Sequence, residues 1–137
     1  MLTVALLLAW LAAGGCKSEA RRMSEYPYFI RTLDARWQVA REGFRTGNPN
    51  VSIVAVLLKD LAGAGDSLRL SYDGPNKDRA IAELTQVARQ FQEDLAAQVD
   101  MRFGSVVLLP GVKPQDVGRS VEKAYQGYAR FRELVKL

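Results

Sequence analysis

The chain has 137 residues, of which 48% are hydrophobic and 25% charged, and its 19 Lys and Arg against 15 Asp and Glu give a formal net charge of +4. It contains no histidine and a single cysteine. Without histidine the chain lacks the usual general base, the commonest zinc ligand and the proximal haem ligand, and a lone cysteine excludes an intramolecular disulfide. Since only carboxylates, Lys, Tyr or Ser are left for catalysis, we predict that the protein is not an enzyme and uses no metal or cofactor.

The first sixteen residues form an uncharged apolar segment that ends in the only cysteine, Cys16. From Leu2 to Ala13 the one polar side chain is that of Thr3. This run is shorter than the roughly 20 apolar residues that cross a bilayer, and it is typical of the apolar region of a secretory signal peptide. We therefore predict that residues 1–16 form a signal segment with its cleavage site at the end of this run. There are two alternatives. The segment is an ordinary cleaved signal in which the cysteine is incidental, or it is a membrane anchor that is retained.

The residues Ala13-Gly14-Gly15-Cys16 resemble the lipobox of bacterial lipoproteins, in which small residues precede an invariant cysteine. The resemblance implies that the Cys16 thiol is diacylglycerated, that the preceding peptide is removed and that the new amino terminus receives a fatty acyl chain such as palmitate. It implies a membrane partner reached through the lipidated Cys16 and a place in the cell envelope. In lipoproteins of the enterobacterial kind, an Asp directly after the cysteine signals retention in the inner membrane. Lys17 occupies that position here, so the resemblance favours the periplasmic face of the outer membrane. The resemblance covers this segment alone.

After the cysteine we expect a polar tether over residues 17–24 and one helical domain over residues 25–137. The first helix is expected from Tyr26 or Pro27 to Phe44, where apolar residues recur at spacings of three and four. Its expected apolar stripe consists of Phe29, Leu33, Trp37, Ala40 and Phe44.

Three further helices are predicted from the same spacing. One begins near Asn50, which is a favourable cap, and continues to about Tyr72; the next runs from Lys77 to about Phe103; the last begins near Pro114. The apolar connection over residues 105–112 is expected to fold over an end of the bundle, or to form a lip for a hydrophobic ligand or a partner.

Four amphipathic helices with mostly short connections predict an all-α fold, an antiparallel four-helix bundle. The alternative is an α+β fold, because residues 51–58 are rich in β-branched side chains and residues 67–72 alternate like a strand. In that alternative a third short strand lies near residues 105–109.

The predicted function is that of a non-enzymatic binding or scaffolding module in the envelope with a protein partner. Nucleic acid is not an expected partner, since the basic residues are dispersed. The alternative is a carrier that encloses a small hydrophobic ligand in the bundle core. Candidate ligand or partner contacts are the aromatic residues of the predicted stripes, namely Phe29, Trp37, Phe91, Tyr125, Tyr128 and Phe131.

Overall fold

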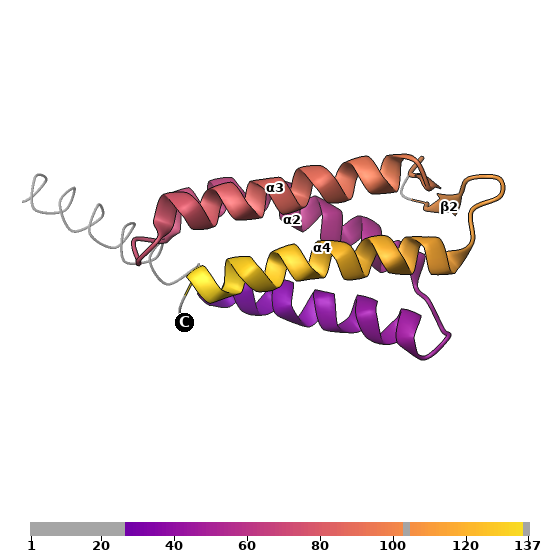
Figure 1. Ribbon diagram of the computed structural model, residues 1–137, viewed down its shortest axis with the longest axis horizontal. Helices are drawn as coiled ribbons and strands as arrows, with labels where there is room; N and C mark the ends of the chain where they lie inside the picture. The colour runs from indigo at the N-terminus through magenta and orange to yellow at the C-terminus, as the bar shows by residue number, and fades with distance from the viewer. Residues whose placement is uncertain (1–26, 103–104, 136–137) are drawn as a thin grey trace, which may run out of the picture.

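The computed structural model describes residues 27–102 and 105–135. Within them the chain forms a first helix over residues 27–45, then α2 (Val51–Ser71), α3 (Lys77–Ala96) and α4 (Pro114–Leu134), which lie alongside one another (Figure 1). Two short strands, β1 (Val99–Asp100) and β2 (Val107–Leu108), pair antiparallel between α3 and α4. The predicted all-α bundle is confirmed. The predicted signal segment, Cys16 and the tether lie outside the described residues.

Short turns make consecutive helices antiparallel. After the first helix the chain reverses through Gly47, whose φ of 78° is in the left-handed region that glycine tolerates. Between α2 and α3 the Tyr72 hydroxyl donates a hydrogen bond of 2.6 Å to the carbonyl of Pro75. This bond closes the turn over the bundle end, and Asn76, with a φ of 60°, then leads into α3.

The α+β alternative is wrong for residues 51–58 and 67–72, because residues 51–71 form α2 and Tyr72 is its C-cap. The helical spacing of the apolar residues prevails there over the β-branched composition, since it lets one face of α2 enter the core. That face consists of Val54, Leu57, Leu58, Leu61, Ala64 and Leu68, all buried. Asn50 occupies the N-cap position of α2, but its side chain makes no capping hydrogen bond.

The prediction that the third helix reaches Phe103 is wrong, because α3 ends at Ala96. Gln98 leaves the helix and turns toward α4. Its amide nitrogen donates to the carbonyl of Asp116 at 3.2 Å, and its amide oxygen accepts from the Ser120 hydroxyl at 3.0 Å. The strand pairing of Val99 with Leu108 then carries the apolar connection across the end of the bundle, where Val106, Leu108 and Val112 pack against the core.

The four helices bury one contiguous core. The last helix and its C-cap contribute a buried apolar stripe that consists of Val117, Val121, Ala124, Tyr128, Phe131 and Val135. In the first helix the buried side chains are Ile30, Leu33, Trp37 and Ala40, whereas Phe29 and Phe44 are partly buried at its margins. Among the described residues, no helix combines the length and hydropathy that a membrane span needs.

Candidate functional site

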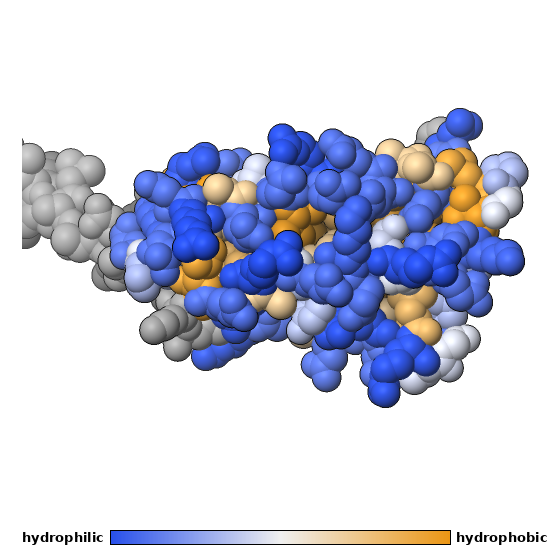
Figure 2. Space-filling model, in the orientation of Figure 1, coloured by the Kyte–Doolittle hydropathy of each residue, from blue (hydrophilic) through white to orange (hydrophobic). Residues whose placement is uncertain are grey.

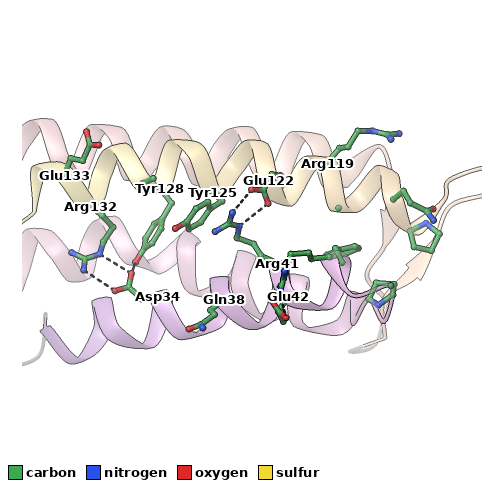
Figure 3. Close-up of a pocket in the computed structure, with 18 residues that line it drawn as sticks. Asp34, Gln38, Arg41, Glu42, Arg119, Glu122, Tyr125, Tyr128, Arg132 and Glu133 are labelled. Atoms are coloured by element: carbon green, nitrogen blue, oxygen red, sulfur yellow. Dashed lines mark hydrogen bonds and ion pairs between the residues drawn. The ribbon is translucent and has the colours of Figure 1, made fainter.

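A groove with a volume of about 1360 Å³ runs between the first helix and α4 (Figure 3). Its side chains are spaced three or four apart on each helix, so each set lies along one edge. We call it the polar groove. The first helix lines it with Asp34, Gln38, Arg41 and Arg45, and α4 lines it with Gly118, Glu122, Tyr125, Ala129 and Arg132.

At one end of the polar groove, Asp34 joins the two helices. Its Oδ1 accepts a hydrogen bond of 2.5 Å from the Tyr128 hydroxyl, and its two carboxylate oxygens accept from Nε and Nη2 of Arg132 at 3.1 Å each. Burial of the phenol, followed by the hydrogen bond to Asp34, raises the pKa of Tyr128 far above its ordinary value. The phenol therefore keeps its proton and acts as a hydrogen-bond donor.

Near the middle of the groove, Arg41 crosses from the first helix to α4. Its Nη2 and Nε donate to the two carboxylate oxygens of Glu122 at 2.7 and 3.0 Å, and its guanidinium carbon lies 3.7 Å from the centroid of the Tyr125 ring. The hydrogen bond to Glu122 raises the pKa of Arg41. The bidentate pair and the stacked ring together fix the orientation of the guanidinium plane.

The lining charges balance. Four arginines and four acidic residues line the groove. In the described part of the chain, each of these except Glu133 belongs to an ion pair. The groove therefore offers paired charges of both signs around an aromatic ring. Such an arrangement suits a ligand that carries both signs of charge, as the side chains of a protein segment do.

The predicted aromatic residues meet in space, with one exception. Trp37 lies at the centre, with ring centroids at 5.8 Å from Phe91, 5.8 Å from Tyr125 and 5.4 Å from Tyr128. Phe131 joins the cluster through Tyr128 at 5.6 Å. The exception is Phe29, which lies between the first helix and α2.

Four members of this aromatic cluster are inaccessible in the folded chain. Trp37, Phe91, Tyr128 and Phe131 are each at most 1% exposed, so they act as core side chains. Tyr125 is half-buried and forms part of the groove floor under Arg41. Within residues 27–102 and 105–135, the buried indole nitrogen of Trp37 has no hydrogen-bond partner. Of the predicted contacts, Tyr125 is therefore the one that the structure places at the groove surface.

Sequence reasoning missed the charged members of the groove. The bond from Arg41 to Glu122 joins residues 81 positions apart, and those from Arg132 to Asp34 join residues 98 apart. Local periodicity places these side chains beside the apolar stripes but does not show which helix they meet. The sequence does contain one signal for a polar stripe on the first helix. Its members recur at spacings of four, three and four, and they are Asp34, Gln38, Arg41 and Arg45.

Neither a family model, nor a curated protein, nor a solved structure matches this chain. Among residues 27–102 and 105–135, no group of three or more Cys, Asp or Glu side chains could hold a metal ion. The surface shown in Figure 2, over α3, α4 and the first helix, is mostly hydrophilic. Hydrophobic residues show at the end that carries the hairpin and in smaller patches along the bundle.

Proposed function

We propose that the protein is a lipid-anchored component of the bacterial cell envelope that binds an envelope protein, without catalysis, through the polar groove. The observation that carries this proposal is the Arg41–Glu122 pair stacked on Tyr125. Arginine and tyrosine are enriched among residues that dominate binding at protein interfaces, especially where their geometry is fixed beforehand.

The electrostatics of the groove support binding rather than proton transfer. Asp34 and Glu122 are each held by an arginine in a bidentate pair, and the hydrogen bond from Arg45 lowers the pKa of Glu42. A general base needs a pKa near the working pH and access to a substrate proton. Carboxylates tied to arginines in this way serve better as fixed acceptors.

The alternative of a hydrophobic-ligand carrier draws less support. Its expected lining residues Trp37, Phe91 and Tyr128 contact one another through their rings and are at most 1% exposed. A carrier function would require these aromatic rings to move apart so that a ligand could enter the core. Binding at the groove requires no such change.

The anchor is tested by comparing wild type with Cys16→Ser in a bacterial host. We expect the wild-type protein to lose residues 1–15, gain the mass of a diacylglycerol and an acyl chain, and sediment with membranes. The serine variant should gain no lipid mass and should leave the membrane fraction. An unmodified Cys16 together with a freely soluble wild-type product would contradict the anchor.

The groove is tested by cross-linking in intact cells with Arg41→Gln against a matched control, Arg130→Gln. Both changes remove one arginine from an ion pair between helices, since Arg41 pairs with Glu122 and Arg130 pairs with Glu83. Only Arg41 lines the polar groove. We expect a cross-linked protein that wild type and Arg130→Gln share and Arg41→Gln loses. If both variants cross-linked the same protein to the same extent, the role of the groove in binding would be refuted.

A further inference from the structure

A second surface lies on the opposite edge of the first helix, where it meets α2. Two hollows of about 620 and 450 Å³ follow this seam. We call it the apolar face. Tyr28, Thr32, Ala35 and Val39 from the first helix and Ile53 and Leu70 from α2 line these hollows. We include Val56, which is exposed and follows Ile53 by one helical turn on the same side of α2.

The apolar face carries most of the large hydrophobic side chains that the described residues expose. Tyr28 is 76% exposed, Leu70 70%, Val39 53% and Val56 41%, and only two other large hydrophobic residues are exposed, both near the hairpin. On the first helix the face residues recur at spacings of four, three and four, outside the stripe that enters the core. An apolar surface that continues along two helices indicates an interaction site.

Each of the two helices adds a cation near this face. Arg31 lines one of the hollows with Tyr28 and Ala35, and Lys59, which is exposed, follows Val56 by one helical turn on α2. Neither side chain forms an ion pair within the described part of the chain. Between them, Arg36 and Asp60 neutralise each other at 2.9 Å. Long cationic side chains around an apolar surface are typical of segments that lie on anionic bilayers, where the stems pack on apolar groups and the charges reach the headgroups.

We propose that the apolar face rests on the surface of an anionic lipid bilayer. This inference depends on the proposed lipid anchor. Ten residues, 17–26, separate Cys16 from the first described residue, and ten extended residues span at most about 36 Å. Because the anchor keeps the bilayer at a high effective concentration next to the first helix, weak apolar and ionic contacts suffice to orient the domain.

The polar groove stays open in this orientation. Its residues on the first helix, Asp34 and Arg41, point toward α4 (Figure 3). Ala35 and Val39 instead line a hollow together with Ile53 of α2. The first helix thus has one edge for lipid and one for a partner. An envelope protein could reach the groove while the domain lies on the membrane.

The experiment uses the full chain, lipidated on Cys16 as verified by intact mass, and reconstituted into vesicles of phosphatidylethanolamine and phosphatidylglycerol. Because lipidation consumes the only native thiol, a new cysteine is the single site for an environment-sensitive fluorophore. Leu70→Cys and Val39→Cys place the label on the apolar face. Ala82→Cys, an exposed position of α3, is the matched control.

We expect labels at residues 70 and 39 to show blue-shifted emission and at least twofold quenching by nitroxide lipids, whereas the label at residue 82 should show neither. With Arg31→Gln and Lys59→Gln together, quenching at residue 70 should weaken in these vesicles but not in vesicles of neutral lipid.

The proposal would be overturned if the labels at residues 70 and 39 behaved like the label at residue 82. A blue shift without nitroxide quenching would also overturn it, and would point to a second copy of this chain on the face. Since only protein with lipid on Cys16 is tested, a failed anchor is detected separately by the mass measurement.

Discussion

At the scale of single residues, Asp34 is the most connected polar side chain between the first helix and α4. It accepts hydrogen bonds from the Tyr128 hydroxyl and from two nitrogens of Arg132. The phenol is nearly excluded from solvent, and its other acceptor is the Ile30 carbonyl at a longer 3.4 Å. The loss of the carboxylate would leave a buried donor and a half-buried cation poorly satisfied.

Replacement of Asp34 by alanine should therefore destabilise the bundle by about 1 to 2 kcal/mol, a range that allows for the partial exposure of the pair. The free energy of unfolding from urea denaturation measures the effect. The control is Asp66→Ala, which removes a carboxylate that is 83% exposed and paired with Arg69 within α2. Equal effects of the two changes would show that the hydrogen bond to Tyr128 contributes nothing.

The raised pKa of Tyr128 makes stability depend on alkaline pH. Below the ordinary tyrosine pKa of 10.0, both the folded and the unfolded chain hold the phenol proton. Above it, the unfolded chain releases that proton and the folded chain keeps it, so the free energy of unfolding should fall by up to about 1.4 kcal/mol per pH unit. Tyr128→Phe should remove this part of the slope between pH 9 and 11.

The appropriate control for that slope is Tyr28→Phe, because Tyr28 is 76% exposed. Because the rest of the chain is the same in all three proteins, only differences between the slopes are informative. Wild type and Tyr28→Phe should fall in parallel, and Tyr128→Phe should fall less steeply. Three identical slopes would mean that Tyr128 titrates alike in the folded and unfolded chain.

At the scale of the helices, α3 and α4 approach closely at Gly127. A Cβ atom there would lie 2.7 Å from Cγ2 of Val87, which is too close for two carbon atoms. Gly127→Ala gains about 1 kcal/mol of helix propensity, but overpacking a buried contact costs about 1 to 3 kcal/mol. We expect net destabilisation in thermal and urea unfolding, and partial rescue when Val87→Ala is added.

Gly63 supplies the matched control in α2. It is exposed, and no heavy atom lies within 4 Å of the position that its Cβ would occupy. Gly63→Ala should therefore stabilise the protein by about 0.5 to 1 kcal/mol, since propensity acts there without a clash. If both glycine changes stabilise the bundle, the close approach at Gly127 is not a constraint.

The helices were predictable from the sequence because burial imposes a spacing of three and four on apolar residues. The stripe from Val117 to Val135 is buried throughout, and the mixed signals of α2 were resolved by the same spacing. The end of α3 was not predictable. It depends on the bonds from Gln98 to Asp116 and Ser120 across the bundle, and no local pattern shows such contacts. The polar groove was missed for the same reason, since Arg41 and Glu122 meet only after the helices have packed.

At the scale of the whole molecule, Trp37 links the helices into one unit. Its ring contacts Phe91 of α3 and both Tyr125 and Tyr128 of α4. A side chain of the first helix that contacts two other helices cannot be exposed unless the packing between them is lost. The first helix, which provides both the groove and the apolar face, is therefore held to the rest of the bundle through its own core residue.

This packing predicts that the domain unfolds in a single step. The chain contains two tryptophans, Trp10 and Trp37, so after removal of residues 1–15 the fluorescence reports on Trp37 alone. Loss of helix by far-UV circular dichroism and the red shift of Trp37 emission should share one urea midpoint, as expected of a two-state domain of this size. An Ala40→Gly variant, which weakens the first helix at a buried position, should lower both midpoints equally. If the fluorescence midpoint fell below that of helix loss, the first helix would detach before the remaining bundle unfolds. The polar groove and the apolar face would then exist only while that helix is docked, and both binding surfaces would be lost together.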